Sequence, residues 1–294
     1  MNNYPKVLLL GNGINRSFAG DDWNDLVKKL HINRKVPMDS LKDVPFPLKA
    51  VLSTNDNVYD SIKNNDELFY GLSDEKLEES RSLMESLLDI PFDYILTTNY
   101  SYEIERIADP KIRRDGKNCK SKNLVKGNRV EGKYLLSSYT NVSSKERPIK
   151  VFHIHGEAKK PDSIILGHYY YGSLLSKMQS RIQNNQFIIQ KQGKPPVVNS
   201  WMDAFIMGDV YTLGFGFDLS EMDLWWLLCR KKREKAEHGK LYFYESSSDD
   251  NSIKHALLES YGGECKSLGY RGKPDDYISF YKDAIEDISK QINN

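Results

Sequence analysis

The sequence lacks the features that mark several classes of protein. Its three cysteines, Cys119, Cys229 and Cys265, lie far apart and form no C-x-x-C pair. A disulfide framework and a zinc ribbon are therefore not expected, and this cysteine usage fits a reducing cytosol. No run of 18 apolar residues occurs, so no membrane span is expected. The apolar run at 7–10 is too short for a signal peptide, and we expect a cytoplasmic protein.

The chain also lacks an excess of charge of either sign. It has 42 basic and 41 acidic residues, for a formal net charge of +1. No global field attracts nucleic acid, so direct nucleic-acid binding is not expected. The stretch 111–133 is locally basic, with nine Lys or Arg against Asp115 and Glu131. Such a stretch favours a solvated loop, with docking to an acidic partner as the alternative.

Short apolar runs that end in glycine or polar residues alternate with helical patterns. We expect strands at 6–10, 92–98, 134–139, 149–155, 164–166, 211–215 and 241–244. We expect helices at 22–30, from an N-cap at Ser73 to Pro91, at 100–108, from 224 onward and at 277–292. This alternation predicts an α/β fold, a Rossmann-like and mainly parallel sheet flanked by helices.

The length of 294 residues fits one large α/β domain or two small ones. We predict a single domain over residues 1–294. Residues 31–72 are polar and are broken by Pro45 and Pro47, which indicates loops with short helices. We therefore expect a helical or loop insertion at 31–92, and a C-terminal helical region at 246–294.

The first motif, GNGIN, follows the first expected strand. Gly11 and Gly13 can let backbone N–H groups approach a pyrophosphate, with Asn12 and Asn15 beside them. Arg16 stands where the dinucleotide fingerprint G-x-G-x-x-G needs its third glycine. A strand-to-helix turn without a ligand remains the alternative.

The second motif, TTNY, ends the strand at 92–98. The Asn99 amide is both donor and acceptor, so beside Thr98 it can hold a ribose hydroxyl or a water. The alternative is structural, because Thr98 or Asn99 can cap the helix expected at 100–108.

The third motif, HIHG, is more specific. His153 and His155 are two residues apart, so on a strand both point to the same side. His155 precedes Gly156 at the strand end and is the candidate catalytic histidine. His153 lies deeper and fits a hydrogen-bonded core histidine. A metal site needs a third ligand that the sequence does not identify, so we predict no metal.

Two later strand ends and one aromatic segment complete the set. Gly214 and Gly216 form a second glycine turn that can approach the adenosine side of a nucleotide, with Asp218 beside it. Glu245 ends a strand and can accept from ribose hydroxyls, or be an ordinary strand-end carboxylate. The segment 166–172, with three tyrosines, is a candidate lid or pocket wall.

Taken in order, GNGIN, ILTTNY, FHIHGE and LGFGFDLSEMD resemble the sirtuin-like family over about residues 5–245. The chain is more similar to the NAD-hydrolysing modules of bacterial anti-phage defence systems than to the deacylases. The resemblance implies a Rossmann-like sheet that binds NAD+ as a substrate. It places Asn99 beside the nicotinamide ribose and His155 as the catalytic histidine. The same resemblance puts Gly11, Gly13 and Asn15 near the pyrophosphate, and Gly214 and Gly216, with Asp218 as their neighbour, near the adenosine.

Two departures separate the chain from the deacylases. The four-cysteine zinc module is missing, and so is the segment G-I-P-x-F-R after the first glycine motif. We therefore expect an NAD+ glycohydrolase that gives ADP-ribose, an NAD-depleting effector in anti-phage defence. We expect a trigger to activate it, or assembly as a homo-oligomer or with a partner defence protein.

Three alternatives remain open. One is a non-catalytic sensor of NAD or ADP-ribose within a defence complex. Another is a deacylase or ADP-ribosyltransferase, which the missing zinc module disfavours. The last is a structural subunit associated with nucleic acid, which the near-neutral charge disfavours.

Overall fold

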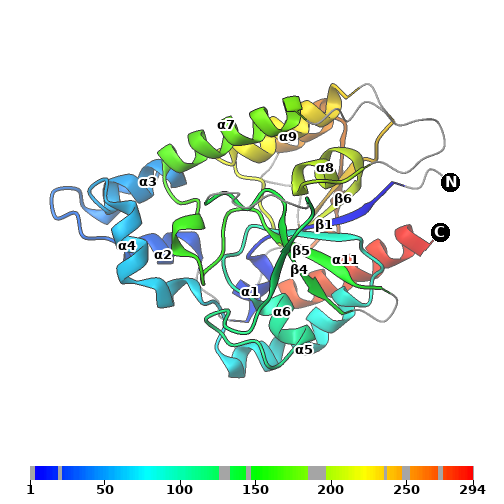
Figure 1. Ribbon diagram of the computed structural model, residues 1–294, viewed down its shortest axis with the longest axis horizontal. Helices are drawn as coiled ribbons and strands as arrows, with labels where there is room; N and C mark the ends of the chain where they lie inside the picture. Colours follow the sequence, from blue (N-terminus) through cyan, green and yellow to red (C-terminus); the bar gives the residue numbers. More distant parts are fainter. Residues whose placement is uncertain are drawn as a thin grey trace.

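The structure is a computed structural model that describes residues 4–18, 22–125, 133–143, 147–184, 197–234, 237–246, 252–270 and 274–293. An eight-stranded sheet in the order β3-β4-β5-β2-β1-β6-β7-β8 runs through its centre (Figure 1). The strands are β1 (Lys6–Leu10), β2 (Tyr94–Thr97), β3 (Ser121–Asn123), β4 (Ser138–Val142), β5 (Ile149–His153), β6 (Asp209–Leu213), β7 (Leu241–Glu245) and β8 (Gly263–Ser267).

The sheet is mainly parallel, which confirms the predicted α/β class. The six strands from β5 to β8 in sheet order pair in parallel, and β3 and β4 add an antiparallel edge. The chain leaves β1 toward β2 on one side and returns to β6 on the other. Leu10 lies opposite Thr97 and Leu213, so these three strands end at one edge. Ligands of such sheets bind at this edge, where the strand order reverses.

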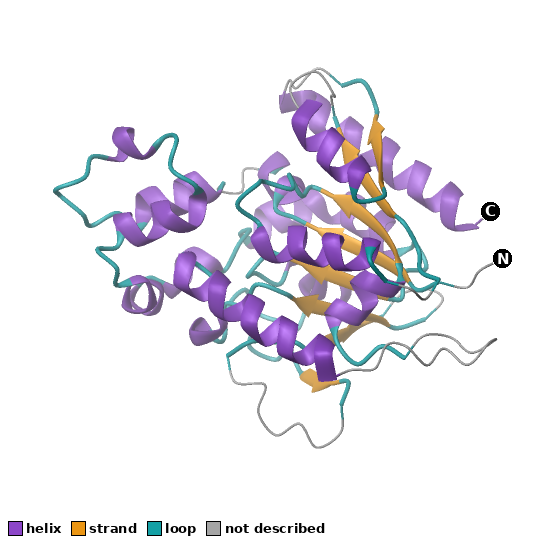
Figure 2. Cartoon of the chain, turned by 90° about the horizontal axis from the view of Figure 1, so that it is seen from above, coloured by secondary structure: helices purple, strands orange, loops and turns teal. Residues whose placement is uncertain are grey.

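Helices cover both faces of the sheet (Figures 1 and 2). Alternate residues of β1 enter opposite cores, Leu9 on one face and Leu8 on the other. The helices on the Leu9 face are α7 (His168–Asn184), α8 (Trp201–Met207), α9 (Met222–Lys232) and α10 (Ser252–Ser260). Those on the Leu8 face are α1 (Gly13–Ser17), α5 (Asp74–Leu88), α6 (Glu103–Ala108) and α11 (Pro274–Asn293).

A small helical lobe stands beside this three-layer body, at the left of Figure 1 and away from the chain ends. It contains α2 (Trp23–Lys29), the 3-10 helices η1 (Met38–Leu41) and η2 (Asp66–Phe69), α3 (Phe46–Ser53) and α4 (Val58–Asn64). A further 3-10 helix, η3 (Pro161–Ser163), lies against α4. Asp22 starts α2 with a capping box, and Leu26, Val27, Ile62 and Tyr100 lie in the lobe core. The short helices predicted within 31–72 are confirmed, whereas the single domain over 1–294 stays a prediction.

One predicted strand is displaced and another is wrong. The strand predicted at 134–139 overlaps β4 (Ser138–Val142) only at Ser138 and Tyr139; before it, the Leu136 carbonyl accepts from the Trp201 N–H at 3.1 Å. No strand forms at 164–166, where the Ile165 N–H donates to the His155 carbonyl at 2.8 Å. Both runs are apolar because they are buried, and short buried loops share that pattern with strands.

Two boundaries also differ from the prediction. The strand predicted at 149–155 ends at His153, because Gly156 turns the chain with a φ of 99°. His155 therefore lies in the turn after β5. The region 246–294 contains a strand, β8, as well as helices α10 and α11, because β8 pairs with β7 at the sheet edge.

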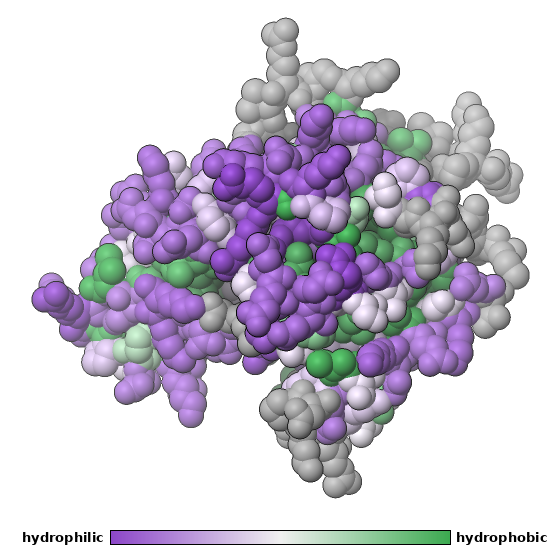
Figure 3. All heavy atoms as spheres, turned by 90° about the horizontal axis from the view of Figure 1, so that it is seen from below, coloured by the Kyte–Doolittle hydropathy of each residue, from purple (hydrophilic) through white to green (hydrophobic). Residues whose placement is uncertain are grey.

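The surface is largely hydrophilic on the face seen in Figure 3, with hydrophobic residues showing in small areas between. None of the helices in the described part of the chain combines the length and the apolar character that crossing a membrane requires.

Candidate active site

The residues singled out from the sequence gather at the carboxyl edge of the sheet. They follow or end β1 (Gly11, Asn12, Gly13, Asn15), β2 (Thr98, Asn99), β5 (His155), β6 (Gly214, Gly216, Asp218) and β7 (Glu245). The Thr98 N–H donates to the Leu10 carbonyl at 3.1 Å, which joins the ends of β1 and β2.

The two glycine turns pack directly against each other. The Gly13 N–H donates to the Gly214 carbonyl at 2.8 Å. A Cβ on Gly11 would lie 2.4 Å from that carbonyl oxygen, and Gly214 has a φ of 64°. The close approach of the two backbones is thus enough to require glycine at Gly11, Gly13 and Gly214, and no ligand is needed to account for them. Gly216 differs, since a Cβ there would meet nothing within 4 Å.

Asn99 does not cap the following helix. Helix α6 begins at Glu103, its N-cap is Tyr102, and no side chain caps it, so the capping alternative for Thr98 and Asn99 is wrong. Asn99 Nδ2 instead donates to the Gly11 carbonyl at 3.4 Å. Its Oδ1 is buried and has no hydrogen-bond partner among the described residues. An unsatisfied buried acceptor costs about 1–3 kcal/mol, so it points to a ligand.

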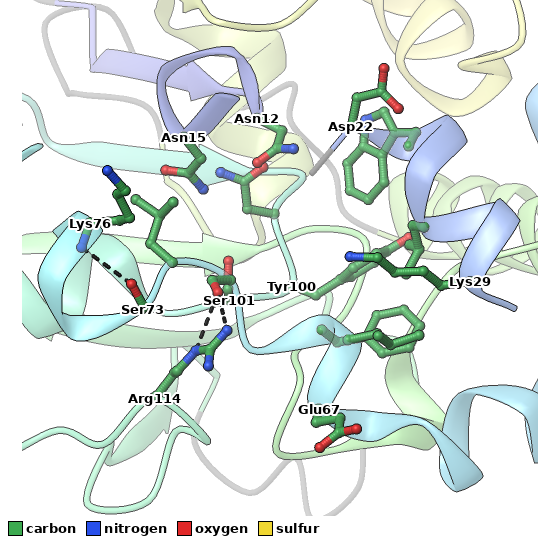
Figure 4. Close-up of a pocket in the computed structure, with 17 residues that line it drawn as sticks. Asn12, Asn15, Asp22, Lys29, Glu67, Ser73, Lys76, Tyr100, Ser101 and Arg114 are labelled. Atoms are coloured by element: carbon green, nitrogen blue, oxygen red, sulfur yellow. Dashed lines mark hydrogen bonds between the residues drawn. The ribbon is translucent and has the colours of Figure 1, made fainter. Parts of the chain in front are cut away.

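Asn99 lines a polar cavity of about 420 Å³ between the sheet edge and the lobe, which we call the first cavity. Figure 4 shows Asn12 and Asn15 on one side of it and Arg114 and Glu67 on the other. The remaining wall consists of Asp22, Trp23, Leu26, Lys29, Leu68, Phe69, Gly71, Leu72, Ser73, Lys76, Tyr100 and Ser101.

His153 is the buried, hydrogen-bonded histidine that the sequence predicts. Its Nδ1 lies 2.8 Å from the Asn99 carbonyl oxygen and its Nε2 lies 2.9 Å from Glu105 Oε1. A carbonyl and a carboxylate both accept, so the ring donates from both nitrogens and is an imidazolium. Burial opposes that charge, but Glu105 outweighs it and raises the pKa of His153 to about 9. The positively charged ring thus holds the backbone of Asn99.

His155 faces α9. Its Nε2 lies 2.9 Å from Asp223 Oδ2, and both side chains are buried. Burial lowers the pKa of His155, but the charge and hydrogen bond of Asp223 outweigh it, so the net shift is upward. With Asp223 ionised, Nε2–H donates to it, which leaves Nδ1 as the basic nitrogen. Nδ1 has no hydrogen-bond partner among the described residues. His153 therefore bonds to Asn99 and Glu105, whereas His155 bonds to Asp223.

A second carboxylate stands beside this pair. Glu221 Oε2 lies 3.9 Å from His155 Nε2 and accepts from the Tyr171 hydroxyl at 3.2 Å. Burial raises the pKa of Glu221 to about 7. The Tyr171 ring also contacts His155 edge-on, with the ring centroids 5.4 Å apart.

Glu221 and Tyr171 line a second cavity of about 650 Å³, so the pocket wall predicted at 166–172 is confirmed. Trp23 of α2 borders both cavities and packs edge-on against Tyr100. One aromatic side chain, Trp23, thus belongs to the walls of both cavities.

The remaining predicted residues lie at the same edge but in other settings. Asp218 lines the second cavity and accepts from the Ser220 hydroxyl at 2.6 Å. The Glu245 carboxylate lies against the His255 imidazole of α10. Sequence reasoning gave no role to Glu221, Asp223 or Trp23. The nearest signal was the spacing E-x-D at the start of a helix that follows a glycine turn.

One atom each of His155, Glu221 and Asp223 lies within 4.8 Å of the others. The shortest of these contacts is the hydrogen bond between His155 and Asp223 at 2.9 Å, so the groups lie close enough to share protons. That the site uses no metal stays a prediction.

Comparison with known proteins identifies the family of this chain. No curated protein matches the chain. A family model described as the SIR2-like domain matches residues 93–265, which is more than half of the chain. The match includes β2 with Asn99, the turn with His155, the second glycine turn and the start of α9. With its mainly parallel sheet and this site, the chain belongs to the SIR2-like domain family.

Proposed function

We propose that this protein is an NAD+ glycohydrolase that cleaves nicotinamide from NAD+ and releases ADP-ribose. One observation carries the proposal. The ends of two adjacent parallel strands present two side chains: Asn99, whose buried Oδ1 has no donor partner among the described residues, and His155, whose Nε2 is held by Asp223 so that Nδ1 is the basic nitrogen. NAD-related chemistry is what the SIR2-like family implies in general, and hydrolysis is the reaction these two side chains fit.

NAD+ would bind through the first cavity. Its volume of about 420 Å³ is in the range of small-molecule sites, and Asn12, Asn15 and Asn99 offer amide donors and acceptors to ribose and phosphate. Gly216, with open space where a Cβ would stand, leaves room for the adenosine side. Gly11, Gly13 and Gly214 would shape the turns beneath the pyrophosphate.

The chemistry would proceed by loss of nicotinamide. Breaking the glycosidic bond sends its electron pair to the nicotinamide ring, which is already cationic and needs no proton. Positive charge builds on the ribose, as in glycoside hydrolysis. Asn99 would orient a ribose hydroxyl or the attacking water through Oδ1. His155 would take the proton from that water at Nδ1.

The arrangement also supports control of the activity. Asn99 lines the first cavity, whereas His155 lies beside Tyr171 and Glu221, which line the second, and Trp23 borders both cavities. We propose that the isolated chain is weakly active, and that a trigger or partner shifts the lobe. A homo-oligomer or a partner defence protein would supply that shift. The protein would then act as an NAD-depleting effector in anti-phage defence, in the cytoplasm.

The test is nicotinamide release from NAD+, followed by chromatography over a series of protein concentrations. Lysate from infected cultures is added in a parallel series. We expect release by the wild type and a loss of about 10²–10⁴-fold for Asn99→Ala and for His155→Ala. His238→Ala, a histidine that bonds the Gly239 carbonyl instead, is the matched control. Full activity of both variants would contradict the catalytic roles proposed for Asn99 and His155. Activity that survives EDTA supports a reaction without metal.

The second candidate is a sensor that binds NAD+ or ADP-ribose without turnover. The observation that favours it is that His155 is buried and lines neither cavity. Calorimetric binding of NAD+ with no nicotinamide release under any activating condition would support the sensor.

A further inference from the structure

The first glycine turn has few backbone donors left for a phosphate group. The Gly11 N–H donates to the Leu213 carbonyl at 3.0 Å, and the Gly13 N–H donates to the Gly214 carbonyl at 2.8 Å. Both groups are used inside the fold, whereas a dinucleotide-binding turn presents such groups to the pyrophosphate. The negative charge of the NAD+ pyrophosphate therefore needs partners elsewhere in the first cavity.

Arg114 lies on the opposite wall of that cavity from Asn12 and Asn15 (Figure 4). Its Nε and Nη2 both donate to the Gly71 carbonyl, at 3.2 and 2.6 Å. Its third nitrogen, Nη1, makes no hydrogen bond to any of the described residues. A guanidinium has five N–H donors, so this contact leaves several of them unused. The Gly71 carbonyl therefore anchors the group at the wall and leaves donors for an anion.

Buried charges of α6 hold the loop that anchors Arg114. Glu103 Oε1 accepts from the Leu72 N–H at 2.9 Å, and Arg106 Nη1 donates to the Leu72 carbonyl at 2.9 Å. Both charged side chains are buried, and a Cβ on Gly71 would collide with the Glu103 carboxylate. The Gly71 carbonyl is therefore held in one position. This preorganises the guanidinium and lowers the entropy lost when it binds a ligand.

The wall of the first cavity carries more positive than negative charge, with Lys29, Lys76 and Arg114 against Asp22 and Glu67. Asp22 is used at the N-cap of α2, and Lys76 forms an ion pair within α5. In contrast, Arg114 pairs with no carboxylate among the described residues. An arginine that is held in place and lacks a carboxylate partner is well suited to bind phosphate.

We propose that Arg114 binds a phosphate group of NAD+, and that the first cavity thereby selects phosphorylated nicotinamide nucleosides. The planar guanidinium matches phosphate oxygens with parallel N–H donors. NAD+ and ADP-ribose carry the phosphate group, whereas nicotinamide riboside and adenosine lack it. The basic stretch 111–133 then contributes a residue to the substrate site. This role rests on the proposed function and adds a specificity-determining residue to it.

The first measurement is calorimetric binding of ADP-ribose, which needs no turnover. Arg114→Gln should weaken binding about 10–100-fold, because hydrogen bonds to a charged group are lost. Arg114→Lys keeps the charge without the planar fork and should recover only part of the affinity. Arg113→Gln is the matched control, since Arg113 pairs with Asp115 at 3.3 Å and does not line the cavity. No binding by the wild type, or equal binding by wild type and Arg114→Gln, would overturn the proposal.

Salt separates a phosphate contact from an effect of Arg114 on the shape of the wall. Attraction between charges is screened as the ionic strength rises. The difference in ADP-ribose affinity between wild type and Arg114→Gln should therefore shrink from about 0.1 M to about 1 M NaCl. A difference that stays constant would mean that Arg114 only shapes the cavity, and would rule out the phosphate contact.

The second measurement is the kinetics of nicotinamide release from NAD+. Arg114→Gln should raise KM about 10–100-fold with kcat little changed, because the phosphate contact is the same in the bound substrate and in the transition state. Release with a wild-type KM in this variant contradicts the role of Arg114 and leaves the hydrolysis standing. ADP-ribose binding that depends on Arg114, without nicotinamide release under any condition, contradicts the hydrolysis and leaves the binding role standing.

Discussion

His153 and Glu105 form a buried ion pair beneath the candidate active site, with 2.9 Å between His153 Nε2 and Glu105 Oε1. The Thr140 hydroxyl donates to the same Glu105 oxygen at 2.8 Å. On the other side of the ring, His153 Nδ1 reaches the carbonyl of Asn99 at 2.8 Å. The pair therefore links the fold's interior to the residue proposed to hold the ribose.

Breaking this pair should destabilise the protein. Glu105→Gln leaves an imidazolium buried without its counter-charge, and loss of one partner of a buried pair costs about 3–5 kcal/mol. Urea unfolding followed by circular dichroism measures the change. Glu78→Gln, an exposed acid on α5, should stay within about 0.5 kcal/mol of wild type. A Glu105→Gln variant as stable as this control would mean that the pair contributes nothing.

The same pair predicts a pH dependence. The pKa of His153 is raised in the folded state to about 9, so folding binds its proton more tightly than the unfolded chain does. Its contribution is fully present below about pH 6.5 and is lost as the pH rises through about 9. We expect the stability gap between wild type and His153→Gln to narrow over that window. Thermal unfolding of both proteins from pH 6 to 10 measures the gap, and a constant gap would contradict the prediction.

The sequence predicted the strand ends of the site well, and for a physical reason. Runs such as the one before Gly11 are buried on both faces, and a polar or glycine residue must follow where the chain leaves the sheet. The parallel order of β1, β2, β5 and β6 then brings Asn99, His155 and the glycine turns to one edge.

The partners of His155 were beyond such reasoning. Asp223 is 68 residues away in the chain, and only the packing of α9 against the sheet brings it to 2.9 Å from the ring. The wall made by Trp23 likewise depends on how the lobe packs against Tyr100. A local sequence pattern predicts which residues are buried and whether they form a helix or a strand. It does not predict which helix packs against which strand end.

The two glycine turns allow a matched test of close packing. Gly11→Ala places a Cβ 2.4 Å from the Gly214 carbonyl oxygen, so backbone must shift at a cost of about 1–3 kcal/mol. Gly216→Ala meets nothing within 4 Å, so the fold should tolerate it. We expect a clear fall in the unfolding midpoint for Gly11→Ala and little change for Gly216→Ala. Equal effects of the two substitutions would show that the turns do not pack as described.

The last prediction concerns the aromatic wall between the two cavities. Trp23 packs 5.3 Å from Tyr100 and 5.9 Å from Phe46, measured between ring centroids, and it borders both cavities. Trp23→Ala would remove the side chain that the two cavities share. If this wall keeps the isolated chain weakly active, the variant should release nicotinamide several-fold faster than wild type.

Tyr59→Ala removes an exposed aromatic of the same lobe and is the matched control. Truncating Trp23 also removes packing, so thermal unfolding is measured alongside to separate loss of fold from loss of rate. Faster release with the fold intact would support the proposal that Trp23 of α2 limits the activity of the isolated chain. Slower release with the fold intact assigns Trp23 instead to the wall that binds the substrate, and the control of activity must then lie elsewhere.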